Sequence, residues 1–593
     1  MKELLSGNEA IARGAYEAGC KVACGYPGTP STEILENVIN YKEINSSWAP
    51  NEKVALEVAI GASFGGARAL VTMKHVGVNV AADPLFTLSY TGVNGGLVLI
   101  TADDPEMHSS QDEQDNRQYA RAAKIPMLEP SDSAECKEFT RLAFKLSEAY
   151  DTPVMLRTTT RISHSKSVVE LSAPETGLPE PKLSKNAAKQ VMLPGNAKVR
   201  HPLVEARMAK LSEDGCSMTI NRMELRDTTV GLITSGACYQ YVCEVAPQAS
   251  ILKLGMVHPL PKALIKEFAS KVDRLIVVEE LDPFIEEQVK AMGIAVSGKE
   301  FFSLCGELTP DRVHKALATA GVIDAASVGT AVAHEPQKLP PRPPNMCPGC
   351  PHRGVFYTLN QLKAYVSGDI GCYTLGFMPP LSAMDTCVCM GASIGMATGV
   401  CKVIPAEEQK RVVAVIGDST FLHTGINGLM DMVYNQSPAT VIILDNRITA
   451  MTGRQDNPAS GYTLMDDPTS SIDFPLLCKA IGVKHVRNVN PYDLEQTRAV
   501  IYEEMNRPEP SVIITDKPCV LVKREGVFKK AAPLCVDQDK CVSCRACLKI
   551  GCPAIEWKQE EGEKGKASID SSLCTGCDVC RQLCKFDAIG RCK

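Results

Sequence analysis

Eight cysteines lie in two runs within the last fifty-odd residues of the sequence, and their spacing suits metal chemistry. The runs read C-x2-C-x2-C-x4-C-P and C-x2-C-x2-C-x3-C, and their members are Cys541, Cys544, Cys547 and Cys552, then Cys574, Cys577, Cys580 and Cys584. Runs of this kind hold two 4Fe-4S clusters, and the fourth cysteine of each run ligates the other cluster. We therefore expect Cys584 to complete the first cluster and Cys552 to complete the second. Such clusters carry single electrons, so the predicted chemistry is one-electron transfer.

Both runs depart slightly from the regular pattern. The first places four residues, 548–551, before its fourth cysteine, and the second is followed by Lys585 instead of proline. We interpret these departures as an altered loop and altered reduction potentials, with both clusters retained. The alternatives are two zinc sites or a disulfide knot, but zinc ribbons use pairs of C-x2-C and not triplets.

A second motif follows two short apolar stretches, 411–416 and 440–444, that read as neighbouring parallel strands. Gly417-Asp418-Ser419 follows the first stretch and Asp445-Asn446 follows the second. The carboxyl ends of such strands meet at one edge of a sheet, where ligands of α/β folds bind. A lone Gly-Asp-Ser would more simply be a strand, a turn and a helix cap. The pair on adjacent strands favours a binding site.

The chemistry of this second motif is that of a magnesium diphosphate site. Mg²⁺ prefers oxygen ligands and often bridges one or two protein groups to phosphates. The pattern resembles the diphosphate motif of thiamine diphosphate enzymes, with Asp418 and Asn446 on the ion and the carbonyl of Ile448 completing the protein ligands. The helix after Ser419 would present N–H groups to the diphosphate.

A thiamine site also needs a carboxylate to protonate the aminopyrimidine ring, and this group must come from a different domain. Glu52 and Glu57 are the candidates, because they precede a helix of small residues, 61–69, that allows close packing. Each could also be a solvated acid on the helix surface, and the residues alone leave the choice open.

The elements that must position these groups indicate an α/β protein of several domains. Apolar stretches at 21–25, 69–73, 96–100 and 154–157 predict a parallel sheet in residues 1–165. Stretches at 229–234 and 274–278 predict a smaller α/β domain within 166–335, and a proline-rich linker precedes a third α/β domain, 336–528. Residues 529–593 form the cysteine-rich module.

Composition narrows the class further. The chain has 593 residues, of which 45% are hydrophobic and 22% charged, and its net charge of −6 argues against nucleic acid as a partner. There is no run of 18 uncharged apolar residues, so no membrane span is expected. The first residues lack an apolar signal core, which predicts a cytoplasmic location. Iron–sulfur clusters tend to be oxygen-sensitive, which suggests an anaerobic host.

Nearly the whole chain resembles the large subunits of the indolepyruvate ferredoxin oxidoreductases, within the 2-oxoacid:ferredoxin oxidoreductase superfamily. Residues 25–33 read Gly-Tyr-Pro-Gly-Thr-Pro-Ser-Thr-Glu, similar to a family segment near the reacting carbon, which implies that Thr29 contacts substrate or cofactor. The same comparison favours Glu52 over Glu57 as the catalytic carboxylate. It also places Lys74 and His75 where they would bind the 2-oxoacid carboxylate or relay protons, although a histidine at a strand end is often structural.

The third domain opens with Cys347-Pro348-Gly349-Cys350-Pro351-His352, a segment that in relatives helps to hold a cluster near the thiamine. By that resemblance Cys347, Cys350, Cys372 and Cys519 could hold a third cluster. The alternative is a tight loop that only shapes the cofactor site. His352 would approach the cofactor diphosphate.

The resemblance implies two doubly wound thiamine-binding domains: a pyrimidine-binding type at 1–165 and a diphosphate- and Mg-binding type at 336–528. A transketolase-C-terminal-like domain would lie between them, followed by a ferredoxin-like module. It implies oxidative decarboxylation of arylpyruvates with coenzyme A to arylacetyl-CoA and CO₂, with electrons passing to ferredoxin. A small beta subunit would supply a missing gamma-type domain, giving a heterotetramer of two large and two small subunits. A non-oxidative decarboxylase and an electron-transfer subunit with a vestigial thiamine site are the alternatives. The preferred arylpyruvate and the coenzyme A site stay open.

Overall fold

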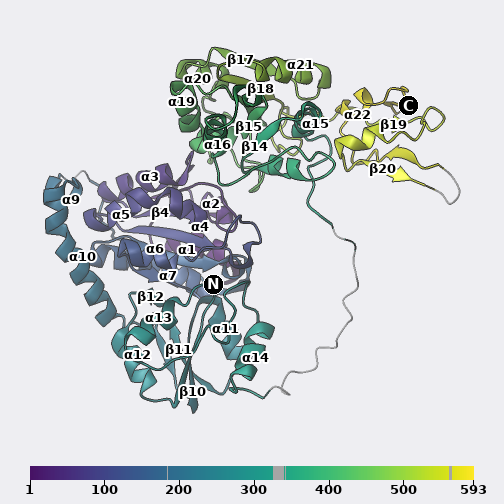
Figure 1. The fold of residues 1–593 in the computed structure, drawn as a ribbon. Coiled ribbons are helices and arrows are strands. Elements are labelled where there is room, and N and C mark those ends of the chain that lie inside the picture. The colour runs from purple at the N-terminus through teal and green to yellow at the C-terminus, as the bar shows by residue number, and fades with distance from the viewer. Residues whose placement is uncertain (183–184, 325–339, 341, 560–563, 593) are drawn as a thin grey trace. The chain divides into compact units, whose positions relative to one another are not determined.

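The computed structural model describes residues 1–182, 185–324, 340, 342–559 and 564–592. The chain forms two compact units, Met1–Gln337 and Lys338–Lys593 (Figure 1). The domain boundary expected at residue 335 falls within 325–339, outside the described residues. Across the described ranges, no helix is long and apolar enough to cross a membrane.

The first unit is built on a seven-stranded sheet with the order β12-β6-β7-β5-β4-β2-β3. All neighbouring pairs are parallel except β12 with β6. The strands are β2 (Val22–Gly25), β3 (Asn45–Trp48), β4 (Ala69–Lys74), β5 (Leu97–Asp103), β6 (Met127–Leu128), β7 (Val154–Thr159) and β12 (Met256–His258). Every residue of β5 is buried, as expected for the centre of a parallel sheet covered on both faces. The predicted parallel α/β architecture is confirmed.

A second, four-stranded sheet lies in the same unit, with the order β13-β10-β11-β9. Its strands are β9 (Arg222–Glu224), β10 (Asp227–Ser235), β11 (Ala249–Leu254) and β13 (Arg274–Val278), which include both predicted stretches. The chain then leaves this sheet so that β12 can pair with β6 of the larger one. The two sheets of the first unit are therefore joined through a strand as well as through side chains.

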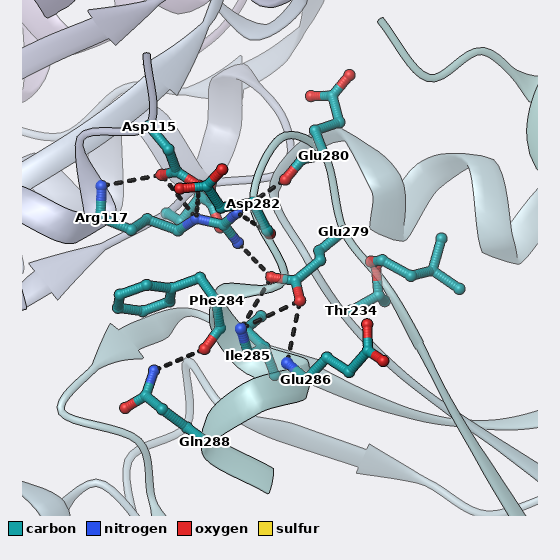
Figure 2. A network of polar contacts seen from close by, with 12 residues as sticks. Asp115, Arg117, Thr234, Glu279, Glu280, Asp282, Phe284, Ile285, Glu286 and Gln288 are labelled. Atoms are coloured by element: carbon teal, nitrogen blue, oxygen red, sulfur yellow. Dashed lines mark hydrogen bonds and ion pairs between the residues drawn. The ribbon is translucent and has the colours of Figure 1, made fainter. Parts of the chain in front are cut away.

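Buried charges also join the two sheets of the first unit (Figure 2). Arg117 opens helix α6 (Arg117–Ala123) and is 1% exposed. It donates to the carboxylates of Asp115 and Glu279, both at 2.6 Å, and Glu279 follows β13 of the smaller sheet. Glu279 in turn accepts from the backbone N–H groups of Ile285 and Glu286 at the start of α13 (Phe284–Ala291). This network fixes the smaller sheet to the larger one.

The second unit contains a five-stranded parallel sheet with the order β14-β15-β16-β18-β17. Its strands are β14 (Tyr365–Ser367), β15 (Val412–Gly417), β16 (Thr440–Asp445), β17 (His485–Val489) and β18 (Ser511–Asp516). The flanking helices include α15 (His352–Leu362), α16 (Ser393–Cys401), α19 (Ile426–Tyr434) and α21 (Leu494–Met505). The strands predicted at 411–416 and 440–444 are β15 and β16, and they lie side by side.

The cysteine-rich module of this unit consists of two small antiparallel ribbons and short helical turns. The ribbons are β19 (Leu534–Val536) with β22 (Ile589–Arg591), and β20 (Ile555–Lys558) with β21 (Lys566–Ile569). The turns are a 3-10 helix, η5 (Ala546–Ile550), and α22 (Val579–Gln582). Cys535 and Cys592, which belong to neither cysteine run, form a disulfide beside the first ribbon.

Candidate active site and metal centres

Polar groups gather at the carboxyl edge of the second unit's sheet. Strands β15 and β16 run in register, with Gly417 opposite Leu444, so Asp418 and Asn446 emerge from adjacent strand ends. Asp418 is 2% exposed and Asn446 7% exposed. The sheet topology therefore brings together the two side chains that the sequence motif predicted as neighbours.

Hydrogen bonds fix this edge. The Asn446 amide lies 3.2 Å from Nε2 of His352, and its oxygen accepts from the N–H of Ile448 at 3.1 Å. The Ser419 and Thr449 hydroxyl oxygens are 2.8 Å apart. The amide of Asn457, which the sequence reasoning did not single out, donates to Asp418 at 3.2 Å. Nothing nearby in sequence pointed to Asn457, because its loop returns to the site only in the fold.

The electrostatics of this edge favour a bound cation. Burial raises the pKa of Asp418 well above its usual range, and the neighbouring carboxylate of Asp445 raises it further. Burial, together with Asp516, raises the pKa of Asp445 to about 6. A divalent ion would compensate this buried negative charge, and the oxygen donors of Asp418 and Asn446 are those that Mg²⁺ prefers. The residues therefore fit a magnesium ion.

His352 offers a separate point of fit for a diphosphate. It is 2% exposed, and its Nδ1 has no hydrogen-bond partner among the described residues. Burial lowers the pKa of His352 to about 4, so the ring is neutral at pH 7. Since buried polar atoms are normally satisfied, an orphaned ring nitrogen at this edge suits a ligand oxygen.

The first unit gathers four other predicted residues around the ends of β4 and β5. Glu52 is the first residue of α3 (Glu52–Phe64) and is 5% exposed. A Cβ on Gly77 would lie 2.7 Å from Oε1 of Glu52, so only glycine leaves room for this carboxylate. Glu57, in contrast, is 47% exposed and pairs with Lys53 at 2.7 Å. The fold buries Glu52 and leaves Glu57 on the surface.

The loop that follows β5, residues 104–116, contacts Lys74, His75 and Thr29. The Lys74 ammonium donates to the carbonyl of Ser109 at 3.0 Å, and the Ser109 hydroxyl donates to the carbonyl of Thr29 at 3.3 Å. Burial lowers the pKa of Lys74, while the carboxylates of Asp104, Asp112 and Glu52 oppose that shift. The loop was not predicted as part of the site; its signal was a pair of acids, 103–104, at the end of a buried strand.

His75 is fully buried beside this group. Its Nε2 lies 3.3 Å from the carbonyl oxygen of Asp112, and its Nδ1 has no partner among the described residues. Thr29, Glu52, Lys74 and His75 thus share one region of the first unit.

The module cysteines form two sets, each around its own cavity. Cys541, Cys544, Cys547 and Cys584 line one cavity, and Cys552, Cys574, Cys577 and Cys580 line another. Burial raises the pKa of the Cys547 thiol, and Cys541, Cys544 and Cys584 raise it further. Thiols crowded in this way are relieved by binding a metal as thiolates. Each set has the four ligands that a 4Fe-4S cluster requires, in the crossed arrangement expected from the spacing.

The four cysteines of the possible third cluster influence one another electrostatically. Burial raises the pKa of Cys350 to about 12, with Cys347 and Cys519 among the contributing charges. Burial raises the pKa of Cys372 to about 11, again with contributions from Cys519 and Cys347. These thiols lie close enough to influence one another's ionisation, and Cys519 is also influenced by the Asp418 carboxylate.

The chain matches known families over almost its full length. The model of the thiamine pyrophosphate enzyme C-terminal TPP binding domain matches residues 369–515, and that of the pyruvate flavodoxin/ferredoxin oxidoreductase thiamine diphosphate-binding domain matches residues 13–222. Indolepyruvate oxidoreductase subunit IorA of Archaeoglobus fulgidus is 41% identical over 99% of this chain and 97% of its own. The subunit of the same name from Pyrococcus horikoshii is 39% identical over 99% and 96%.

A solved structure, the 2-oxoglutarate:ferredoxin oxidoreductase of Magnetococcus marinus, is 16% identical and superimposes with a TM-score of 0.47 over 54% of this chain and 65% of its own. The identity and coverage of the two IorA subunits establish the family by themselves. The chain belongs to the indolepyruvate oxidoreductase IorA family, and it is an oxidoreductase with thiamine diphosphate-binding domains.

Proposed function

We propose that this chain catalyses the oxidative decarboxylation of arylpyruvates, such as indolepyruvate, with coenzyme A to arylacetyl-CoA and CO₂. Electrons leave through 4Fe-4S clusters to ferredoxin. The observation that carries the proposal is the combination, in the second unit, of a buried Asp418–Asn446 edge with two four-cysteine cavities. The substrate class follows from the names of the IorA relatives.

In this proposal the edge residues hold the cofactor. Asp418, Asn446 and the carbonyl of Ile448 bind Mg²⁺, and Gly417 and Ser419 lie at the start of the helix that faces the diphosphate. The unpartnered Nδ1 of His352 would donate a hydrogen bond to a diphosphate oxygen. When bound, thiamine diphosphate supplies the electron sink for loss of CO₂.

The first unit supplies the acid–base and substrate-binding groups in this proposal. Glu52 would hold and exchange a proton with the aminopyrimidine ring, and Gly77 leaves room for the Glu52 carboxylate. Lys74, a half-buried cation, binds the carboxylate of the 2-oxoacid. His75 relays protons, and Thr29 contacts the reacting group.

The cysteine sets carry the electrons. Cys541, Cys544, Cys547 and Cys584 hold one cluster, Cys552, Cys574, Cys577 and Cys580 hold the second, and Cys347, Cys350, Cys372 and Cys519 hold a third. The mutual influence of the last four thiols on one another's ionisation supports the third cluster. Iron counting on the anaerobically purified complex tests it: about twelve irons per chain are expected, and about eight would leave only the two module clusters.

The complete enzyme needs partners beyond this chain. A small subunit provides the gamma-type domain, with two copies of each subunit in the assembly, and ferredoxin takes the electrons. The assay that tests the proposal uses the complex with indolepyruvate, coenzyme A and a viologen dye, without oxygen. Dye reduction that requires both coenzyme A and thiamine diphosphate is expected. Aldehyde without dye reduction would identify a non-oxidative decarboxylase, and no turnover of any arylpyruvate would leave an electron-transfer subunit.

A matched pair of variants tests the role of Glu52. Glu52→Gln is expected to abolish dye reduction with the cluster spectra unchanged, because the amide cannot protonate the aminopyrimidine. Glu57→Gln, five residues along the same helix but exposed, is the control and is expected to keep wild-type turnover. Full activity in Glu52→Gln would remove this residue from the mechanism.

A further inference from the structure

Arg353, in the first turn of α15, is a buried cation to which the proposed chemistry gives no role. It is 2% exposed and follows the Cys347–Cys350 loop directly. Its N–H groups donate to the carbonyls of Cys347 (3.1 Å), Ile550 (3.2 Å), Gly551 (2.6 Å) and Met346, and to the side-chain oxygen of Asn345 (3.1 Å). Since a guanidinium has five N–H donors, all of them are used and the group is held rigidly.

All five of these acceptors are neutral. A buried arginine is normally paired with a carboxylate, as Arg117 is with Asp115 and Glu279 in the first unit. Burial lowers the pKa of Arg353, whereas the thiols of Cys552 and Cys350 act in the opposite direction. Because arginine stays protonated in proteins, the hydrogen bonds leave one positive charge beside these cysteines with no carboxylate partner among the described residues.

An anionic cluster held in the neighbouring four-cysteine cavity would supply the missing negative charge. Arg353 and Cys350 line the same cavity as Cys552, Cys574, Cys577 and Cys580. The loop that carries Cys350 is also held by Tyr492, whose hydroxyl donates to the Gly349 carbonyl at 2.8 Å. A 4Fe-4S cluster with four thiolate ligands is anionic and gains a further negative charge on reduction. A fixed cation beside it therefore stabilises the reduced form more than the oxidised form.

The four-residue spacing of the first cysteine run explains how Arg353 is held. Gly551 is the last of the four residues between Cys547 and Cys552, and its φ is +64°, which favours glycine. A Cβ there would lie 2.8 Å from Cδ of Pro380 and 3.3 Å from Nη1 of Arg353. This turn directs the Gly551 carbonyl to the guanidinium, so the irregular spacing provides an anchoring point for Arg353.

We propose that Arg353 is a positioning residue that docks loop 548–551 against α15 and raises the reduction potential of the cluster held by Cys552, Cys574, Cys577 and Cys580. The inference rests on the proposed function, because it requires that cluster to be present.

The test is a redox titration, followed by electron paramagnetic resonance, of the anaerobic complex carrying Arg353→Gln or Arg353→Lys. Lys549→Gln, in the same loop but exposed, is the control for net charge. Arg353→Gln is expected to lower the midpoint potential of one cluster only. Arg353→Lys keeps the charge and is expected to hold the potential while amide exchange in 546–552 becomes faster. Lys549→Gln is expected to match the wild type.

The possible results distinguish an electrostatic role of Arg353 from a role in folding alone. Equal midpoint potentials in Arg353→Gln and the wild type would overturn the inference. Should Arg353→Gln lose iron while Arg353→Lys keeps it, the charge requirement is supported. Loss of iron from both variants alike would reduce Arg353 to a folding role and would also overturn it. A wild-type complex without module clusters would instead refute the proposed function.

Discussion

Replacing Arg117 with methionine tests whether the buried ion network holds the two sheets of the first unit together. Arg117 is 1% exposed, as are the side chains of its partners Asp115 and Glu279 (Figure 2). Methionine fills most of the volume but leaves two buried carboxylates without their cation. Breaking a buried pair in this way costs about 3–5 kcal/mol. We expect a loss of stability of this size at pH 7.

The loss should depend on pH in a defined direction. Burial already raises the pKa of Glu279, and Arg117 is the main group that opposes this shift. Without Arg117 the folded-state pKa rises further, so the folded protein binds a proton that the unfolded chain releases. Stability then increases as pH falls, and the variant should recover part of its loss between pH 7 and pH 5.

Hydrogen exchange measured on the intact protein is the suitable assay, because a chain of several domains does not unfold in one step. Peptides covering 115–123 and 279–291 should exchange about 10²–10⁴ times faster than in the wild type. Peptides over β15 and β16 serve as the internal reference. Arg121→Met, an exposed residue of the same helix, is the matched control and should change stability by less than about 0.5 kcal/mol. A loss below about 1 kcal/mol, or one independent of pH, would refute the reasoning.

Three further predictions concern single residues. Burial raises the pKa of Glu280 from 4.5 to about 7, so stability should fall by about 3 kcal/mol as pH rises through this window. Glu280→Gln should flatten this pH dependence of stability, measured by denaturation at several pH values. An unchanged slope in the variant would contradict the prediction. Asp418→Asn should weaken binding of thiamine diphosphate with Mg²⁺ by more than about tenfold in isothermal calorimetry, whereas unchanged affinity would exclude Asp418 as a ligand. Gly77→Ala should lower kcat by about 10²-fold with normal cluster spectra, because a Cβ at 2.7 Å displaces the Glu52 carboxylate. Wild-type kcat in that variant would show that the position of Glu52 is not critical.

Much of the fold was predictable because its signals are local. Apolar stretches marked β4, β5, β7, β10, β13, β15 and β16 to within a few residues, since fully buried parallel strands need continuous apolar runs. The antiparallel strand β12 was not predicted, because its three residues carry no periodicity and its partner β6 lies far away in sequence. The disulfide between Cys535 and Cys592 was also not predicted, since pairing depends on the two chain segments meeting at β19 and β22.

The candidate site also has parts that the sequence predicted and parts that it did not. The motif at Asp418 and Asn446 was readable because each residue directly follows its strand, and adjacent parallel strands must end at one edge. The choice between Glu52 and Glu57 was different: both lie on one helix, and only packing against Gly77 buries the first and leaves the second in solvent. The loop at Ser109 was missed because nothing in its sequence shows that it returns to Lys74.

By itself, the sequence determined the ligand chemistry of this protein: the two cysteine runs, the strand-end motif and the α/β class. Each of these depends on residues a few positions apart. Only the tertiary structure decided that Arg353 lies against the module cysteines with neutral hydrogen-bond partners. Such contacts join segments up to about two hundred residues apart, as from Arg353 to Gly551 with a separation of 198. Spacing fixes which atoms can bind a metal, whereas burial and long-range packing fix the charge around it.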